Sequence, residues 1–177
     1  MTEKNDTSRL NEKYIFRNIR QEEIAQAAEI EKICFPPNEA CSYEHMEDRV
    51  KKAPELFLVA EDRDTGKIAG FLNGLATDRE HLTDDFFTDA EVHDPKGKNI
   101  MLLGLDVLPE YQHQGLAREL VRCYKEREKA NGREKLILTC LPDKVEMYQK
   151  FGFKDHGIGG SVWGGEAWHE MSMELWG

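Results

Sequence analysis

The stretch Leu102-Leu-Gly-Leu-Asp-Val-Leu-Pro-Glu-Tyr-Gln-His-Gln-Gly-Leu-Ala-Arg118 contains an apolar run, a short turn and the start of a helical pattern. The apolar run, which extends back to Ile100, is typical of a buried strand, and Pro109 ends it. Backbone N–H groups at the following helix start lack intrahelical acceptors, and the helix dipole adds partial positive charge there. The stretch therefore predicts an anion site suited to a pyrophosphate, which Gly115 would let the backbone approach closely.

This pattern is not specific by itself, because strand–turn–helix units with a glycine are common and most bind nothing. No Gly-Lys-Ser/Thr follows the turn, so a P-loop is excluded. A dinucleotide-binding fingerprint needs three glycines where this turn has one, so that motif is excluded as well.

Length and composition describe a globular chain. Its 177 residues are 40% hydrophobic and 33% charged, which suits one domain with a sizeable core. No apolar stretch approaches the roughly 20 residues that span a bilayer. The first residues, Met1-Thr-Glu-Lys-Asn-Asp, lack the apolar core of a signal peptide, so we expect a cytoplasmic protein. We expect a disordered tail over residues 1–12 and a single domain over residues 13–177.

Charge and cysteine spacing narrow the functional classes. The formal net charge of −10 disfavours binding to nucleic acid or to anionic membranes and favours a cationic small-molecule substrate. The four cysteines, of which Cys41 lies in a loop that could face substrate, show no C-x-x-C spacing. We therefore expect free thiols and no metal site, with Cys41 an ordinary small buried residue rather than a nucleophile.

Periodicity predicts the order βααββ, an acidic insertion, then βαβαββ. That is an α/β (α+β) chain with a mixed sheet and helices on both faces. The expected elements are a strand over 14–19, helices over 21–34 and 42–52, strands over 56–60, 68–75 and 100–105, a helix over 114–131, a strand over 135–140, a short helix over 142–151, and two last strands of which the second covers 166–174.

The segment from Thr77 to Lys98 breaks this pattern with seven acidic residues and few bases. Long connections inside a compact domain are usually functional or disordered. Two interpretations stand: a solvated surface insertion, or a wall beside the substrate that attracts an amine cation.

Two motifs resemble those of the GNAT acetyltransferase superfamily. Gln112-His-Gln-Gly-Leu-Ala117 is similar to its acetyl-CoA pyrophosphate loop, Q/R-x-x-G-x-G/A, and follows an apolar strand as in that family. Met147-Tyr-Gln-Lys-Phe-Gly-Phe153 resembles its closing motif, in which a tyrosine precedes Phe-Gly-Phe. The two motifs occur in the right order, and the resemblance extends from Tyr14 to about Leu175. It implies the GNAT acyl-CoA N-acyltransferase fold and acetyl-CoA as co-substrate.

The resemblance also implies roles for individual residues. Tyr148 matches the general acid that protonates the CoA sulfur, and a phenol with a pKa of about 10 suits that role. Thr139 matches a position beside the substrate in the arylalkylamine N-acetyltransferase group of this superfamily. Cationic side chains for the anionic cofactor could come from Arg118, Arg122, Lys125 and Lys144, although such residues are commonly solvated helix faces. The implied cofactor-binding residues are Leu105, Asp106 and Val107 on the strand, His113, Gln114, Gly115, Leu116, Ala117 and Arg118 in the loop, and Tyr148.

Within the superfamily, the chain most resembles the arylalkylamine (serotonin) N-acetyltransferase group. Three stretches carry this likeness, namely Ala53-Pro-Glu-Leu-Phe-Leu58, Glu80-His-Leu-Thr-Asp-Asp85 and Tyr148 to Phe153. The chain departs from that group at two strand positions, where Met101 and Leu103 replace histidines of a proton path. Neither replacement can take a proton. Asp106 has the opposite strand parity, so its side chain should face the other way.

The general base is therefore unassigned. The candidates are Glu39, His45, His81, Glu166 and His169, and ordered water could serve instead. The leading hypothesis is direct attack of a small arylalkylamine-like primary amine on acetyl-CoA, in a monomer or homodimer. The alternatives are a protein or peptide N-acetyltransferase and a non-catalytic acetyl-CoA-binding sensor.

Overall fold

All the strands that the structure describes join one sheet. The computed structural model describes residues 9–176. The sheet has seven strands in the order β1-β2-β3-β4-β5-β7-β6, antiparallel except where β4 and β5 pair in parallel. The strands are β1 (Tyr14–Asn18), β2 (Phe57–Asp62), β3 (Ile68–Thr77), β4 (Asn99–Val107), β5 (Lys135–Cys140), β6 (Lys154–Ile158) and β7 (His169–Glu174).

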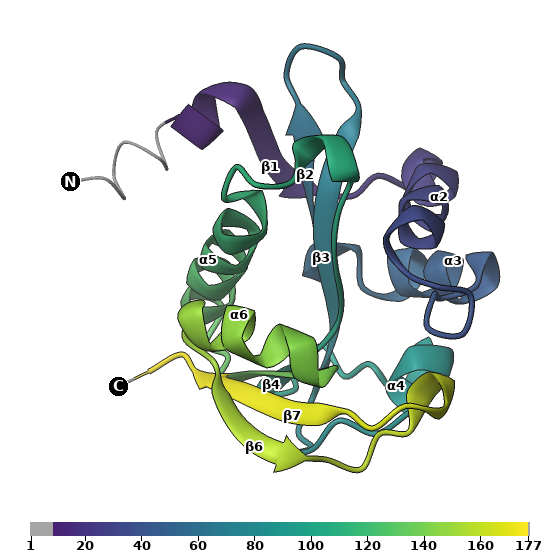
Figure 1. The fold of residues 1–177 in the computed structure, drawn as a ribbon, viewed down its shortest axis with the longest axis vertical. Coiled ribbons are helices and arrows are strands. Elements are labelled where there is room, and N and C mark those ends of the chain that lie inside the picture. The colour runs from purple at the N-terminus through teal and green to yellow at the C-terminus, as the bar shows by residue number, and fades with distance from the viewer. Residues whose placement is uncertain (1–8, 177) are drawn as a thin grey trace.

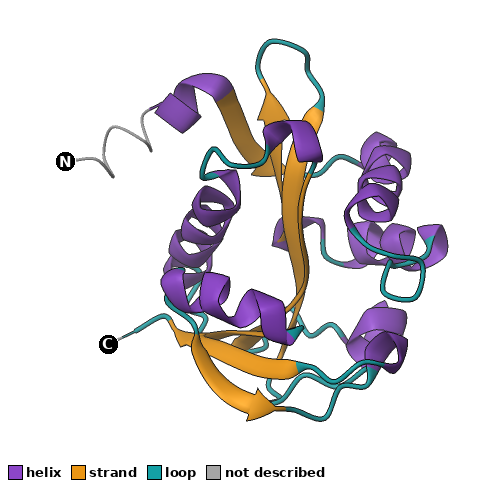
Figure 2. Cartoon of the chain, viewed as in Figure 1, coloured by secondary structure: helices purple, strands orange, loops and turns teal. Residues whose placement is uncertain are grey.

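Helices cover both faces of this sheet, as Figure 2 shows. Helices α2 and α3 lie on one side, and α5 and α6 lie on the other (Figure 1). The predicted α/β architecture, with a mixed sheet and helices on both faces, is confirmed. The helices are α2 (Ile24–Cys34), α3 (Tyr43–Lys52), the short α4 (Asp85–Thr88), α5 (Leu116–Ala130) and α6 (Val145–Lys150).

The sequence accounts for these elements locally. Strand β3 is buried along its whole length, as expected of a central strand covered on both faces. Ser42 begins α3 as predicted, and its hydroxyl accepts a hydrogen bond from the backbone N–H of His45. Tyr124 on the apolar face of α5 donates its hydroxyl to the carbonyl oxygen of Leu56 at 2.9 Å. That bond ties α5 to the entry of β2 and fixes the helix against the sheet.

The sheet opens between β4 and β5. These two strands pair only over Asn99–Met101 and Lys135–Ile137, although each continues beyond the pairing. On the other edge, β4 stays paired with β3 up to Val107, with a register shift near Asn73. Backbone groups on the unpaired edge of β4 therefore face a gap rather than a neighbouring strand. This splay leaves room for a ligand at the middle of the sheet.

Two predicted boundaries were wrong. Residues 9–12 were assigned to a disordered tail, but residues 9–13 are helical and Leu10 is buried with 7% of its surface exposed. Leu10 packs on the core, and Arg63 Nε donates to the carbonyl oxygen of Asn11 at 3.1 Å, which ties this turn to the sheet. The remainder of the expected tail, residues 1–8, lies outside the described residues. The last strand begins at His169 rather than residue 166, because residues 163–165 form a helical turn.

The acidic segment, residues 77–98, packs on the core through a few apolar side chains, and we call it the acidic wall. Leu82 and Phe86 are buried in it with 1% exposure each. Its ends are held to the sheet, because the backbone N–H of Ala76 donates to His93 Nδ1 at 3.0 Å and Glu170 accepts from the backbone N–H of Leu82 at 2.9 Å. The segment is therefore a surface insertion whose acidic side chains stay at least partly exposed while its apolar side chains pack on the core.

Within residues 9–176, no helix is long and apolar enough to cross a membrane. In the same range, no group of three or more histidine, cysteine, aspartate or glutamate side chains is arranged to hold a metal ion.

Candidate active site

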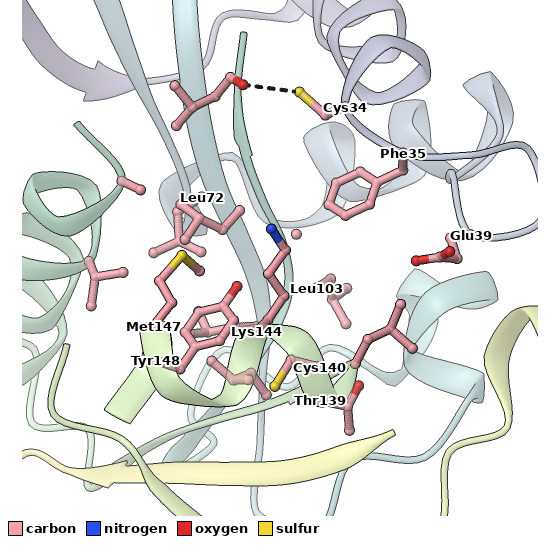
Figure 3. Close-up of a pocket in the computed structure, with 18 of the residues that line it drawn as sticks. Cys34, Phe35, Glu39, Leu72, Leu103, Thr139, Cys140, Lys144, Met147 and Tyr148 are labelled. Carbon is pink, nitrogen blue, oxygen red and sulfur yellow. Dashed lines mark hydrogen bonds between the residues drawn. The ribbon is translucent and has the colours of Figure 1, made fainter. Parts of the chain in front are cut away.

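A cavity of about 720 Å³ occupies the splay between β4 and β5. The loop before α5 borders it at one end, and the segments around residues 35–41 and 163–168 border the other. Figure 3 shows Tyr148 and Met147 from α6 facing Phe35 and Cys34 across this space. One continuous hollow thus connects the predicted anion loop with a second region that the motifs did not mark.

Most of the predicted cofactor residues surround this cavity. Those that line it are Leu105, Val107, His113, Gly115, Leu116, Ala117, Arg118 and Tyr148, and Thr139 lines it as well. Gln114 does not, because its side-chain oxygen accepts hydrogen bonds from Lys13 Nζ and from the Tyr14 hydroxyl, each at 2.9 Å. Gln114 therefore fixes the loop to β1. Among the predicted cationic residues, Lys144 also lines the cavity, whereas Arg122 pairs with Glu119.

The loop before α5 has the backbone that a close anion contact needs. Gly115 is the residue preceding the helix, with a positive φ of 83°, and His113 also has a positive φ of 63°. Left-handed backbone of this kind is costly for residues other than glycine. A Cβ added at Gly115 would meet no protein atom within 4 Å, so the space beside it is open. The first-turn N–H groups of the 15-residue helix α5 point into that space.

Tyr148 lies where the two ends of the cavity meet. Its ring makes edge contacts with Phe151 and Phe153, at centroid distances of 6.0 and 5.7 Å. Its hydroxyl points into the cavity (Figure 3) and makes no hydrogen bond with any described residue. Burial, together with the nearby Cys140 and Asp106, raises the pKa of Tyr148 above its ordinary value. The phenol therefore keeps its proton and can donate it to a ligand atom.

The second end of the cavity is aromatic and acidic. Trp163 stacks on Phe87 with ring centroids 5.1 Å apart, and Phe35 and Trp168 line the same region. Glu39 lines it too, and burial, reinforced by the charges of Glu166 and Asp143, raises the pKa of its carboxyl group. Aromatic faces beside a carboxylate are the chemistry that binds an organic cation.

Hydrogen bonds join two loops at this end of the cavity, and we call this set of contacts the clasp. The indole N–H of Trp163 donates to the carbonyl oxygen of Glu39 at 2.9 Å, and the side chain of Asn38 donates to the carbonyl oxygen of Gly164 at 3.1 Å. The Trp168 indole N–H donates in turn to the carbonyl oxygen of Trp163 at 2.7 Å. The loop after α2 and the loop before β7 therefore meet over the cavity, although they are far apart in sequence.

The candidate bases are distributed unevenly. Glu39 lines the cavity, but the other four candidates do not. His81 binds Glu170 Oε2 at 2.8 Å and has a largely exposed side chain, and His169 binds Asp155 at 3.0 Å. Met101 and Leu103 stand where the arylalkylamine N-acetyltransferase group carries histidines. Leu103 lines the cavity, and Met101 is buried in the core.

The predicted orientation of Asp106 holds, since its side chain is fully buried and does not line the cavity. It faces α2, where it meets Glu31. Sequence reasoning missed Glu31 and Arg49, which line the cavity while being 4% and 3% exposed. A signal for Glu31 was present, because residues 24, 27, 28 and 31 share one buried helix face and a glutamate in that stripe is out of place.

The cysteines are all free thiols, as predicted. Cys41 lines the cavity, but burial raises its pKa to about 11, so the thiolate needed for nucleophilic attack is scarce at neutral pH. Cys140, beside Tyr148, has a pKa raised to about 12 for the same reason. Neither thiol is suited to forming an acyl intermediate.

Comparison with known proteins places this arrangement in a family. The family model described as "Acetyltransferase (GNAT) family" matches residues 24–153. A curated relative, "Probable hydrolase YhcX" of Bacillus subtilis, is 27% identical over 158 residues, which cover 85% of this chain and 30% of the relative. The chain thus spans about a third of that protein's length.

Solved structures share the fold at lower identity. The loading GNATL domain of CurA from Lyngbya majuscula superposes with a TM-score of 0.77 at 19% identity, over 92% of this chain and 98% of that one. A GNAT superfamily phosphinothricin acetyltransferase from Sinorhizobium meliloti, solved with acetyl-CoA, has a TM-score of 0.66 at 15% identity, over 92% and 89%. Since the family model covers both the anion loop and the Tyr148 motif, the chain belongs to the GNAT family of acetyltransferases.

Proposed function

We propose that this protein transfers the acetyl group of acetyl-CoA to the primary amine of a small aromatic cation, with Tyr148 as general acid. One observation carries the proposal: a single cavity joins an open helix-start loop, a splayed strand edge and an aromatic, acidic end. The acetyl-CoA in the phosphinothricin acetyltransferase structure supports the same donor here.

The loop end of the cavity fits the phosphates of CoA. The start of α5 offers unpaired N–H groups and the helix dipole, and Gly115 leaves open space beside them. Arg118 and Lys144 supply positive charge at the cavity wall of a chain that is otherwise acidic. The pantetheine arm would then run along the unpaired edge of β4, where Leu105 and Val107 present backbone polar groups.

Acetyl transfer then needs few further groups. The amine nitrogen attacks the thioester carbonyl carbon, the C–S bond breaks, and the departing sulfur takes the Tyr148 proton. Burial raises the pKa of Tyr148, so the phenol is protonated at neutral pH and can donate its proton to the sulfur as negative charge develops there. Thr139 lines the cavity on β5 and would contact the acceptor.

The aromatic end selects the acceptor. Phe35, Phe87, Trp163 and Trp168 would cover an aryl or alkyl body, and Glu39 would attract the ammonium group. The acidic wall contributes Phe87 rather than a carboxylate, so its part in this end is aromatic contact. The clasp between Glu39 and Trp163 joins two loops across this end, which would leave less room for an extended peptide than for a small molecule.

The test is CoA release from acetyl-CoA with a panel of arylalkylamines, polyamines and short peptides. We expect turnover of phenethylamine or tryptamine above that of polyamines. If only peptides are acetylated, acetyl-CoA remains the donor, but the proposal of a small aromatic amine as acceptor is overturned. Tight acetyl-CoA binding with no acceptor at all would overturn the enzymatic proposal and favour a sensor.

A further inference from the structure

A pair of buried carboxyl groups lies directly behind the middle of the cavity. Glu31 comes from α2 and lines the cavity, while Asp106 comes from β4 and is fully buried. Both reach the backbone of Gly104, where an added Cβ would lie 3.1 Å from Asp106 Oδ1 and 3.6 Å from Glu31 Oε1. The pair therefore sits over the strand segment that would hold the acetyl thioester.

The protein leaves this pair incompletely hydrogen-bonded. Glu31 Oε2 accepts from the backbone N–H of Cys41 at 2.8 Å, which fixes the orientation of the side chain. No N–H or O–H group of the described residues other than a carboxyl proton donates to Glu31 Oε1 or to either Asp106 oxygen. Burial, followed by the charge of Glu31 and a hydrogen bond to it, raises the pKa of Asp106 well above its ordinary value. The raised pKa favours the protonated form of Asp106, and a proton shared between the two carboxyl groups would give their unpaired oxygens a partner.

The titratable and charged groups that act on the pair come from α2, α3, the loop between them and α6, and the phenol of Tyr148 on α6 is one of them. Arg49 on α3 contributes a cation, and its guanidinium donates to Asn73 Oδ1 at 3.5 Å and to the carbonyl oxygen of Phe87 at 3.0 Å. The thiols of Cys34 and Cys41 lie nearby, and burial raises the pKa of each to about 11. With one proton on Asp106, the charges of Glu31 and Arg49 cancel, as a buried cluster requires.

We propose that Glu31 accepts the proton of the acceptor ammonium group and that Asp106 is the positioning residue that holds Glu31 for this step. The inference rests on the proposed acetyl transfer. The ammonium N–H bond breaks and its proton forms an O–H bond at Glu31, which frees the nitrogen lone pair to attack the thioester carbon. As the intermediate collapses, Tyr148 gives its proton to sulfur and regains one from the nitrogen. Glu31 then releases its proton to solvent, which balances the reaction.

This assignment explains how the chain works without the two strand histidines. Met101 and Leu103 leave that strand face apolar, and the base enters from the neighbouring helix instead. Glu39, at the mouth of the cavity, attracts the cation, whereas Glu31 lies deeper, over Gly104.

The experiment measures kcat/KM against pH for the native protein and for Glu31→Gln with one basic amine and one poorly basic fluorinated analogue. Glutamine keeps an oxygen for the Cys41 N–H, so the fold is preserved. We expect a loss on the order of 100-fold at neutral pH with the basic amine, typical of a removed base. The rate of the variant should rise with pH as free amine appears, and the loss should shrink to a few-fold with the analogue. Glu29→Gln, at an exposed position of the same helix, is the matched control and should keep the native profile.

Asp106 variants provide the second arm. Asp106→Leu removes the carboxyl group that holds Glu31 in place, so the acid limb of the kcat/KM profile should move to higher pH. Asp106→Asn still donates from its amide and should return the limb towards the native position. Acetyl-CoA affinity within about twofold of native shows that a variant is folded.

The two failures are distinguishable. If the native protein acetylates amines and Glu31→Gln keeps both its rate and its pH profile, the base assignment is overturned and the proposed function stands. If the native protein acetylates no amine, the proposed function is overturned, and the assignment of Glu31 as base is overturned with it. If Glu31→Gln does not bind acetyl-CoA, the Asp106→Leu profile decides, and an unmoved acid limb overturns the proposal.

Discussion

The two ends of the cavity are built in different ways. The loop end comes from one uninterrupted stretch, β4 through the start of α5, in which strand, turn and helix follow each other in sequence. The second, aromatic and acidic end is the acceptor end. It is assembled from α2, α3, the acidic wall, β5 and the loop before β7, which converge from distant parts of the chain. The loop end depends on backbone geometry at a few positions, whereas the acceptor end depends on side chains.

This difference explains why the donor is easier to assign than the acceptor. Backbone N–H groups at a helix start bind phosphate whatever the surrounding side chains are. An aromatic end changes its ligand whenever one side chain changes. The donor should therefore be a property of the family fold, and the acceptor a property of this chain.

Tyr148 joins the two ends, so its loss should have the largest effect. Tyr148→Phe removes the proton for sulfur and should lower kcat by about 100- to 1,000-fold, with acetyl-CoA affinity nearly unchanged. Because the pKa of the phenol is raised, the loss should be similar at neutral and mildly alkaline pH. Steady-state kinetics and calorimetry check this, with the exposed Tyr43→Phe as control. Full activity in Tyr148→Phe would separate this tyrosine from the chemistry.

The loop end is tested at Gly115. Gly115→Val places a side chain in the open space before α5 and should weaken acetyl-CoA binding on the order of 100-fold. Gly132→Val is a matched control, because Gly132 has the same φ of 83° and open surroundings at the other end of α5. Each variant should lose about 1–2 kcal/mol of stability. Equal affinities in the two variants would place the phosphates elsewhere.

The acceptor end is tested at Trp163. Trp163→Leu removes the stack on Phe87 and the bond to Glu39, and should raise the KM for an arylalkylamine by about tenfold, as expected for a lost aromatic contact. The KM for acetyl-CoA should not change, because we place acetyl-CoA at the loop end and the amine at the acceptor end. Trp176→Leu, half-exposed near the C-terminal end of α5, serves as control. A parallel rise in both KM values would show that the two ends are not separate.

The smallest expected effect is on the free energy of unfolding, and it concerns Asp106, which is buried behind the acceptor end of the cavity. The pKa of Asp106 is raised in the folded state above its ordinary value of about 4. At pH values between these two pKa values, the carboxyl group is protonated in the folded chain and ionised in the unfolded chain, so the unfolded chain binds fewer protons. Stability contributed by this group is therefore lost as pH rises. Asp106→Asn should raise the free energy of unfolding by about 1–2 kcal/mol at neutral pH, with the gain shrinking as pH falls towards 4.

Denaturant unfolding at several pH values measures this, with the exposed Asp48→Asn as control. A variant that is less stable than the native protein at neutral pH would show that Asp106 is ionised and paired in the fold.

Much of the fold followed from the sequence. The apolar runs, the stripe of α5 and Ser42 before α3 predicted elements whose order the structure confirms. The boundary errors fall where local packing or a turn decides, at Leu10 before β1 and at the helical turn of residues 163–165 before β7. The sequence left two interpretations of the acidic segment open, because which side chains reach the core and the cavity, as Phe86 and Phe87 do, depends on tertiary packing.

By itself the sequence determined the loop and the tyrosine, because each is a local pattern in which neighbours along the chain are neighbours in space. It also gave the correct strand parity of Asp106. Only the tertiary structure brought Glu31 to Asp106, Trp163 to Phe87 and both loops over the cavity. Those contacts depend on how α2 and the last strands pack on the splayed sheet, and packing between distant segments leaves no periodic trace in the sequence.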